Sequence, residues 1–305
     1  MSFHLVDPGA LSVSDVERLF ELAALAGSGS LLLDKLRGSS VFTVFLEDST
    51  RTRISFEVAA RRVGAEVFDF CSHGSSLSKG ETFEDTLRNI VSLGADFLII
   101  RHSDGDFFDR LLVDFPLDAH VISGGHGARH HPTQGLLDVF CISKYNSRLD
   151  DVSVLILGDV VHSRVARSQV QILKTLGCKD IRLVGPSSFL PDPSKDVLFS
   201  SVNTTSSLEE GLSGVDVVSL LRVQRERFSD NENINLDEYV ANYGFKRSHA
   251  ERLKEGAIVI HPQPLNRNLE ISDDVVALPC CKFFEQVELG VFMRMACLVW
   301  LYNCL

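Results

Sequence analysis

Cationic and hydroxyl side chains recur at one kind of place in this sequence, directly after short apolar runs. Ser49, Thr50 and Arg51 follow one such run and precede a helical pattern. Backbone N–H groups at a helix N-terminus, joined by hydroxyls and a guanidinium, form a site suited to phosphate. Taken alone, this stretch is explained equally well as a capped helix with solvated arginines.

The same arrangement returns four times further along the chain. Arg101, Arg164 and Arg222 each follow an apolar run, and His131 follows a loop rich in Gly and His. His131 stands before Pro132, which favours a helix start, so its ring could donate to a carbonyl oxygen. The recurrence predicts a cleft for a small polyanion between two α/β domains. No Ser–His–Asp or Cys–His arrangement stands out, which favours catalysis by positioning and electrostatics over covalent catalysis.

The sequence argues against two other kinds of site. His126, His130 and His131 invite a metal site, but no Asp, Glu or Cys lies beside them, and the glycines make the loop irregular. Gly158 follows a predicted strand as in a nucleotide-binding turn, yet the G-x-G-x-x-G fingerprint is absent. We therefore expect neither a metal nor a cofactor, and a dinucleotide-dependent oxidoreductase is disfavoured.

Short β-rich apolar runs alternate with helical patterns, which predicts an α/β fold with a parallel sheet flanked by helices in each half. The expected strands are 41–46, 66–70, 96–100, 120–123, 152–157, 181–184, 215–220 and 257–260. The expected helices are about 53–63, 81–93, 105–113, 133–146, 163–176, 207–212, 248–254 and 283–302. Capping-box spacing at Ser14 and Glu17 predicts a further helix near the N-terminus. Ligands of such sheets bind beyond the carboxyl ends of the strands, where the cations lie.

The order of elements divides the 305 residues into two domains of similar size. We expect the first domain over 1–132, with a C-terminal helix over 284–305 that packs back on it. The second domain is expected over 147–283, and the helix over 133–146 links the two.

Composition and charge exclude several classes of partner. The chain has 30 Lys and Arg against 41 Asp and Glu, a net charge of −11, which disfavours nucleic-acid binding through a general basic surface. The N-terminus lacks the pattern of a signal peptide, and the apolar stretch 291–302 is too short to span a bilayer. The 7 cysteines form no C-x-x-C pair, which is typical of reduced thiols. We expect a cytoplasmic protein without nucleic-acid or membrane partners.

Longer motifs around these residues resemble the aspartate/ornithine carbamoyltransferase family over essentially the whole chain. The matching segments are residues 45–57, 78–82, 131–134, 158–164, 222–227, 261–267 and 286–296. The S-T-R-T-R motif at 49–53 and the H-P-T-Q motif at 131–134 are shared by both branches of the family. The R-V-Q-x-E-R and H-P-x-P stretches resemble the aspartate branch, whereas the H-C-L-P turn and S-M-G loop of the ornithine branch are absent.

The resemblance implies transfer of the carbamoyl group of carbamoyl phosphate to the amine of L-aspartate. The products would be N-carbamoyl-L-aspartate and phosphate, in the committed step of de novo pyrimidine (UMP) synthesis. The resemblance also implies an active site in the cleft between a carbamoyl-phosphate-binding and an aspartate-binding domain, and a homotrimer with shared active sites. Regulatory or dihydroorotase-type subunits are further potential partners. A carbamoyltransferase for another amine, such as ornithine, and a non-catalytic binding relative stay open as alternatives.

The resemblance also assigns roles to residues of this chain. Carbamoyl phosphate would be bound by Ser49, Thr50, Arg51, Thr52, Ser75, Arg101, His131, Gln134, Pro262 and Gln263. L-Aspartate would be bound by Lys79, Arg164, Arg222 and Gln224, where guanidinium groups suit carboxylates. The catalytic set would be Arg51, Thr52, Lys79, Arg101, His131 and Gln134.

Within these sets the resemblance distinguishes several tasks. Thr52, Arg101 and His131 would polarise the carbonyl group and stabilise the oxyanion, and the others would hold phosphate or orient the carbamoyl NH₂. Ser75 and Lys79 would enter the active site of a neighbouring subunit. Many relatives carry glycine at the positions of Gln263 and Asn268, so this turn departs from the family pattern. The loop over 225–247, with Arg225, Arg227 and Lys246, receives no role.

Overall fold

The computed structural model describes residues 4–29, 33–71, 75–224 and 235–303. The chain divides into two compact units, one formed by Met1–Leu137 with Val287–Leu305 and the other by Asp138–Gln286. Both divisions fall inside helices, α5 (Pro132–Ser143) and α10 (Phe283–Tyr302). Each unit contains one parallel sheet flanked by helices, which confirms the predicted fold class.

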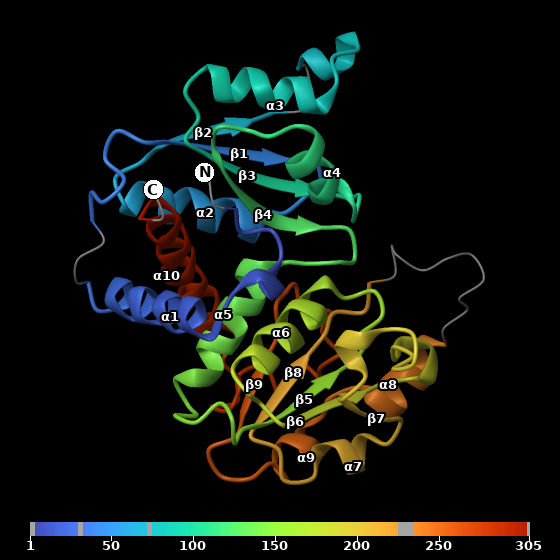
Figure 1. Ribbon diagram of the computed structural model, residues 1–305. Coiled ribbons are helices and arrows are strands. Elements are labelled where there is room, and N and C mark those ends of the chain that lie inside the picture. Colours follow the sequence, from blue (N-terminus) through green and yellow to red (C-terminus); the bar gives the residue numbers. More distant parts are fainter. Residues whose placement is uncertain (1–3, 30–32, 72–74, 225–234, 304–305) are drawn as a thin grey trace. The chain divides into compact units, whose positions relative to one another are not determined.

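Four parallel strands form the sheet of the first unit, in the order β2-β1-β3-β4 (Figure 1). They are β1 (Ser40–Phe45), β2 (Glu66–Phe70), β3 (Phe97–His102) and β4 (His120–His126). Val41 in β1 is in register with Val67 of β2 and Phe97 of β3. β3 and β4 continue two to three residues beyond their predicted ends, 100 and 123, so Arg101 lies inside a strand rather than after it.

Helices cover both faces of this sheet. Besides most of α10, the α-helices described in the first unit are α1 (Val13–Gly27), α2 (Thr50–Arg62), α3 (Phe83–Ser92), α4 (Phe107–Asp114) and the first part of α5. Leu87 of α3 and Leu111 of α4 pack with Val44 and Ile100 of the sheet in one buried cluster. The apolar faces of the predicted helical patterns therefore do form this core.

The start of α1 differs from its predicted position. Ser12, not Ser14, is the N-cap residue: its Oγ accepts a hydrogen bond from the Asp15 N–H at 3.2 Å, and Asp15 Oδ2 accepts one from the Ser12 N–H at 2.9 Å. An aspartate at the third helical position completes this capping box as a glutamate would. The helix therefore begins three residues before Val16, the first apolar residue of the predicted pattern.

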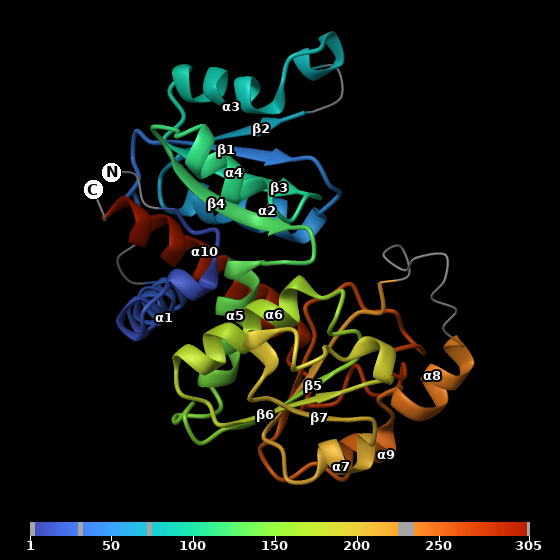
Figure 2. The ribbon, with the colours of Figure 1, turned by 45° about the vertical axis from the view of Figure 1, so that its right-hand side comes forward.

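The C-terminal helix α10 packs on the first unit, as predicted. The guanidinium of Arg294 lies 5.1 Å from the centre of the Phe56 ring in α2, and Figure 2 shows α10 running beside α2. Gly27 lies so close that a Cβ there would be 3.3 Å from the Phe292 ring. Across the parts of the chain that are described, no helix, α10 included, combines the length and apolarity needed to cross a membrane.

The second unit contains a five-stranded parallel sheet in the order β7-β6-β5-β8-β9. Its strands are β5 (Ser153–Leu157), β6 (Asp180–Val184), β7 (Asn203–Thr205), β8 (Val217–Leu220) and β9 (Ile258–Ile260). The sequence pattern did not predict β7, because this edge strand has only three residues and none of them is apolar. The four other strands match predicted runs.

Helices flank this sheet as well. They are α6 (Arg164–Thr175), α7 (Leu208–Leu212), α8 (Leu236–Tyr243) and α9 (Arg247–Ala250). Short 3-10 helices are η1 (Pro8–Ala10), η2 (Ser76–Lys79), η3 (Ser187–Phe189) and η4 (Val197–Phe199). α8 lies within 225–247, where the sequence predicts a loop, and Asn235 Oδ1 caps it by accepting hydrogen bonds from the N–H groups of Asp237 and Glu238.

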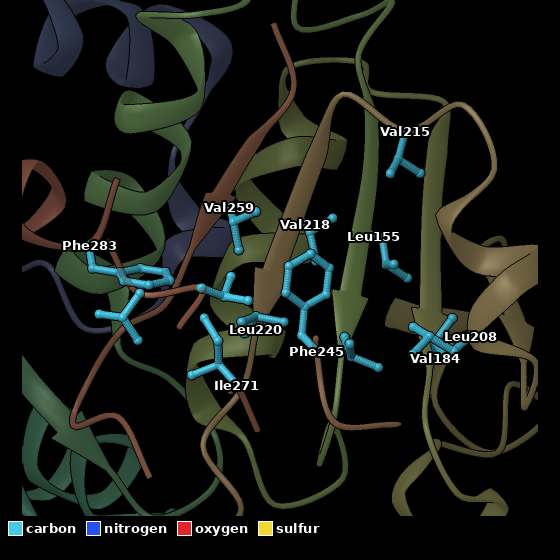
Figure 3. Packing of buried hydrophobic residues seen from close by; sticks show 13 residues of the cluster. Leu155, Val184, Leu208, Val215, Val218, Leu220, Phe245, Val259, Ile271 and Phe283 are labelled. Carbon is cyan, nitrogen blue, oxygen red and sulfur yellow. The ribbon is translucent and has the colours of Figure 1, made fainter. Parts of the chain in front are cut away.

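One face of the second sheet carries the main buried cluster (Figure 3). Leu155, Val218 and Val259 come from three neighbouring strands, and Phe245 and Ile271 come from the segments that cover them. α6 is joined to the sheet by a buried hydrogen bond, because the Ser219 hydroxyl of β8 donates to Gln169 Oε1 at 2.9 Å. Packing of this kind fixes the ends of β5, β8 and β9, where the candidate site residues follow.

Candidate active site

The S-T-R-T-R motif at 49–53, which could bind phosphate, forms the start of α2 after β1. Ser49 is the N-cap residue and has extended backbone, but its side chain makes no capping hydrogen bond with any described residue. Thr50 and Arg51 are exposed at the first turn, whereas Thr52 is buried. The first-turn N–H groups, which have no partner inside a helix, are therefore not occupied by the Ser49 hydroxyl.

Thr52 meets His131 from a distant part of the chain. Thr52 Oγ1 lies 3.4 Å from His131 Nε2, and both side chains are buried. His131 stands just before α5, which starts at Pro132 as predicted, and its carbonyl oxygen accepts a hydrogen bond from the Gln134 N–H at 2.9 Å. The structure thus brings together three predicted site residues at the starts of two helices.

Arg101 lies near the carboxyl end of β3, and its side chain is 13% exposed. Its Nη1 donates a hydrogen bond to the Gly124 carbonyl oxygen at 3.0 Å, and its Nε lies 3.3 Å from Glu47 Oε2. Glu47 was not predicted as a site residue. The available signal was its position directly after β1, which neighbours β3, because the carboxyl ends of parallel neighbours meet at one edge.

Ser75 and Lys79 bracket η2, where Ser75 is the N-cap residue and Lys79 ends the helix. The Ser78 hydroxyl donates to the Ser75 carbonyl oxygen at 2.7 Å and so tightens this turn. The Lys79 ammonium is exposed and makes no hydrogen bond or ion pair with the described part of the chain. Residues 72–74 of the predicted loop lie outside the described residues.

In the second unit Arg164 begins α6, after β5. The N-cap residue Ser163 accepts a hydrogen bond from the Ala166 N–H at 3.1 Å, and Arg164 itself is 6% exposed. The preceding turn is held by the buried Asp159, whose Oδ1 lies 2.9 Å from His162 Nδ1. Sequence reasoning gave no role to this aspartate–histidine pair.

Arg222 and Gln224 follow β8 and reach the same edge of the sheet. Gln224 Nε2 donates a hydrogen bond to the His162 carbonyl oxygen at 3.0 Å, which joins the segment after β8 to the turn after β5. The structure therefore brings Gln224 next to the turn that leads into Arg164. Arg225 and Arg227 lie outside the described residues.

Glu270, which sequence reasoning missed, holds the segment between Arg222 and Gln224. Its Oε1 accepts hydrogen bonds from the Val223 N–H at 3.0 Å and from Asn266 Nδ2 at 2.9 Å. Glu270 is 2% exposed, and burial raises its pKa, while these hydrogen bonds act in the opposite direction. The only signal in the sequence was an acidic residue between two apolar ones, Leu269 and Ile271.

The turn after β9 contains Pro262 and Gln263. The Gln263 N–H donates to His261 Nδ1 at 2.8 Å, and Gln263 Nε2 donates to the Phe283 carbonyl oxygen at 3.3 Å. Gln263 has φ +59° and Asn268 has φ +62°, in the left-handed region that glycine adopts without strain. This geometry explains why glycine suits both positions, which are the two where this chain departs from the family pattern.

The polar groups of both units follow parallel strands at their carboxyl ends. In the described ranges, no group of three or more His, Cys, Asp and Glu side chains could hold a metal ion. Hydroxyls, guanidinium groups and helix N-termini dominate instead, and these are groups that bind phosphate and carboxylate. Fold and side chains together define a two-unit α/β protein equipped for small anionic substrates.

Comparison with known proteins identifies the family. Residues 4–144 match the model of the aspartate/ornithine carbamoyltransferase carbamoyl-P binding domain, and residues 150–301 match that of the Asp/Orn binding domain. The aspartate carbamoyltransferase catalytic subunit of Salinispora tropica is 44% identical over 279 residues, which cover 91% of this chain and 89% of that protein. Its counterpart in Salinispora arenicola is 41% identical and covers 97% and 96%.

Solved structures agree with these matches. Aspartate transcarbamoylase from Trypanosoma cruzi, in complex with carbamoyl aspartate and phosphate, is 31% identical with a TM-score of 0.88, over 98% of this chain and 95% of that one. The complex of the same enzyme with N-(phosphonacetyl)-L-aspartic acid has a TM-score of 0.89 at 30% identity, over 98% and 95%. The chain belongs to the aspartate/ornithine carbamoyltransferase family, which confirms the resemblance of its motifs.

Proposed function

We propose that this protein transfers the carbamoyl group of carbamoyl phosphate to the amine of L-aspartate. The products are N-carbamoyl-L-aspartate and phosphate, in the committed step of de novo pyrimidine (UMP) synthesis. The observation that carries the proposal is the 3.4 Å approach of Thr52 Oγ1 and His131 Nε2 beside the N-terminus of α2. A phosphate and the carbonyl oxygen attached to it need donors at these two adjacent places.

Carbamoyl phosphate occupies the strand ends of the first unit in this proposal. The hydroxyls of Ser49 and Thr50 and the Arg51 guanidinium bind the phosphate with the first-turn N–H groups of α2. Arg101 bridges phosphate and carbonyl oxygen. Gln134, with the carbonyl groups of Pro262 and Gln263, orients the carbamoyl NH₂; the carbonyl group of Pro262 precedes a turn that two hydrogen bonds of Gln263 fix.

L-Aspartate is bound by groups of the second unit. Arg164 and Arg222 are the guanidinium partners of its two carboxylates, a pairing that their fork geometry favours. Gln224 assists them, and its hydrogen bond to the His162 carbonyl oxygen supports this assignment because it fixes the side chain near the start of α6. The dicarboxylate acceptor also agrees with the names of the curated relatives.

The reaction proceeds by attack of the aspartate amine nitrogen on the carbonyl carbon. The C=O electron pair moves to oxygen, and Thr52, Arg101 and His131 stabilise the oxyanion. The C=O bond then re-forms as the C–O bond to phosphate breaks. The leaving phosphate accepts the proton that the amine loses, so no protein base is required. A pH–rate profile that demands a protein base outside this set would contradict that step.

The decisive experiment for the acceptor offers several amines to the purified protein with carbamoyl phosphate. We expect carbamoylation of L-aspartate and release of phosphate, and little or no product with ornithine. Faster turnover with ornithine would support the alternative carbamoyltransferase. Binding of carbamoyl phosphate without turnover of any amine would support the non-catalytic relative.

We further propose a homotrimer in which Ser75 and Lys79 reach the active site of a neighbouring subunit. The exposed Lys79 ammonium, which has no partner within the described ranges, supports this role. Mixing inactive Arg51→Ala chains with inactive Lys79→Ala chains tests it. Because a shared site takes one residue from each chain, one of the three sites in each mixed trimer would be intact, which is about a quarter of all sites after random 1:1 reassociation. Activity that does not return in verified mixed trimers would contradict sharing.

Two further proposals concern the compartment and larger assemblies. We place the protein in the cytoplasm because its described cysteines, among them the buried Cys141 and Cys297, are free thiols. Regulatory or dihydroorotase-type subunits would appear as larger species when the native protein is sedimented from its own cell extract. An aspartate saturation curve measured on the same material would show whether such subunits or nucleotides change the kinetics.

A further inference from the structure

The strand pair β3 and β4 contains an irregularity at Arg101. Ile100 is paired with Ser123, but the next pair joins His102 to His126, so two residues of β4 stand opposite Arg101 alone. These two residues are Gly124 and Gly125. An extra residue of this kind is a β-bulge, which bends a strand and redirects what it faces. Gly125 has φ +110°, a backbone conformation that a residue with a side chain rarely adopts.

The bulge lies against the side chain of Arg101. Its Gly124 carbonyl oxygen accepts the hydrogen bond from Arg101 Nη1 at 3.0 Å. A Cβ at Gly124 would lie 3.2 Å from the Phe45 ring and 3.5 Å from Arg101 Cβ, so a side chain here would press on the Phe45 ring. The direction of the Gly124 carbonyl group therefore decides where one end of the guanidinium is held.

Two buried polar side chains close this bulge from either side. Ser123 Oγ accepts a hydrogen bond from the Gly125 N–H at 3.1 Å and lies 2.9 Å from His126 Nδ1. A hydroxyl that accepts from one side can donate its own proton to the ring nitrogen. Ser123 is 0% and His126 3% exposed, so water does not compete for these contacts.

The His126 ring is itself fixed by packing. The ring meets the Phe108 ring edge-on, with 4.7 Å between their centroids. The backbone N–H of His126 donates a hydrogen bond to the His130 carbonyl oxygen at 3.1 Å. Ser123, Gly125 and His126 thus form a closed set of contacts that spans the bulge. We call this set, with Gly124 inside it, the β4 clasp.

We propose that Ser123 and His126 are positioning residues that, through the β4 clasp, hold the Gly124 carbonyl group against Arg101. This inference rests on the proposed function, in which Arg101 bridges phosphate and carbonyl oxygen. Without the Ser123 hydroxyl, the Gly125 N–H and the His126 ring each lose a buried partner, and the peptide at Gly124 is no longer held. Arg101 then keeps its charge but loses the carbonyl group that orients it.

The first test is Ser123→Ala, with Thr43→Val as a matched control. Thr43 is also a buried hydroxyl of this sheet, and it donates to Asp69 Oδ1 at 2.8 Å, away from Arg101. We expect Ser123→Ala to lower kcat/KM for carbamoyl phosphate about 10- to 100-fold, because misplacing a catalytic group by about 1 Å has effects of that size. Thr43→Val should lose a similar amount of thermal stability with kcat/KM within about twofold of wild type.

A double-mutant cycle decides whether Ser123 acts through Arg101. The dissociation constant of N-(phosphonacetyl)-L-aspartic acid is measured by calorimetry for wild type, Ser123→Ala, Arg101→Ala and the double variant. We expect Ser123→Ala to weaken binding about tenfold in the wild-type background and by less than twofold when Arg101 is already absent. Equal weakening in both backgrounds would overturn the proposal.

A second variant covers the case in which Ser123→Ala does not fold. His126→Phe keeps a ring against Phe108 but removes Nδ1, and it enters the same cycle with the same expected outcome. Turnover of the wild-type protein is measured first. Absence of that turnover would refute the proposed function, whereas an additive cycle in an active enzyme would refute only the role of the β4 clasp.

Discussion

Replacing Glu270 by alanine should weaken aspartate binding, although Glu270 is not one of the residues proposed to bind aspartate. Its Oε1 accepts hydrogen bonds from the Val223 N–H at 3.0 Å and from Asn266 Nδ2 at 2.9 Å. Val223 lies between Arg222 and Gln224, which bind aspartate in the proposed mechanism. Glu270→Ala therefore releases the backbone that carries both side chains.

The expected loss of stability follows from the contacts that disappear. Two hydrogen bonds to a buried carboxylate and the space left by its side chain together suggest about 2–4 kcal/mol. Glu270→Gln provides the matched control, because its amide oxygen can accept the same two hydrogen bonds. We expect Glu270→Gln to change stability by no more than about 1 kcal/mol.

Thermal unfolding and steady-state kinetics measure these effects. Glu270→Ala should lower Tm by about 5–15 °C, given about 2–4 °C per kcal/mol for a unit of this size. The KM for aspartate should rise about tenfold or more with Glu270→Ala and less than threefold with Glu270→Gln, while the KM for carbamoyl phosphate stays nearly constant. An unchanged KM for aspartate in folded Glu270→Ala protein would refute the reasoning.

Comparing the stability of the wild-type protein and Glu270→Gln at several pH values tests the direction of the pKa shift of Glu270. Burial raises this pKa above its ordinary value of 4.5. The folded protein then holds the proton more tightly than the unfolded chain, so the contribution of Glu270 to stability is full below pH 4.5 and is lost as pH rises through the folded-state pKa. Relative to wild type, Glu270→Gln should therefore gain stability as pH rises from about 4 to about 7. A stability difference that stays constant over this range would contradict the raised pKa.

Three further substitutions test separate parts of the site. His131→Ala should lower kcat about 100-fold with little change in carbamoyl phosphate affinity, and unchanged turnover would remove His131 from oxyanion stabilisation. Arg222→Ala should raise the KM for aspartate about 10- to 100-fold, and an effect confined to carbamoyl phosphate would contradict its assignment. Asn268→Ala should cost about 1–2 kcal/mol in chemical denaturation, because φ is +62° and Asn268 Oδ1 accepts from the Asp273 N–H, whereas Asn268→Gly should cost less.

Much of the fold was predictable because its strands are short, apolar and bounded by turn residues. The runs at 41–46 and 152–157 became β1 and β5 with a shift of one residue at most. The hydrophobic pattern did not predict elements that lack a run of apolar residues. β7 consists of Asn203–Thr205 at an exposed edge, and α8 follows a segment whose first residues read as polar loop.

The candidate site was predictable only as far as its motifs extend. Thr52, His131 and Gln134 were expected together and are found together at the starts of α2 and α5. The residues that hold such groups in place were not predictable, because their partners are set by the tertiary fold. Glu270 Oε1 accepts a hydrogen bond from the Val223 N–H, 47 residues earlier in the chain, and no local sequence pattern predicts that contact.

Local charge, rather than net charge, decides which anions this protein binds. The chain carries −11, but at physiological ionic strength charges are screened over about 8 Å, so most exposed carboxylates act weakly on a ligand at the strand ends. Glu47 is an exception, because its Oε2 lies 3.3 Å from Arg101 Nε. It offsets part of the Arg101 charge and, as an ion-pair partner on the Nε side, helps to hold the guanidinium whose Nη1 donates to the Gly124 carbonyl oxygen. Glu47 therefore acts against anion binding by its charge and in favour of it by orientation, and the Glu47→Gln variant separates the two: it should strengthen phosphate binding only if charge is the larger effect.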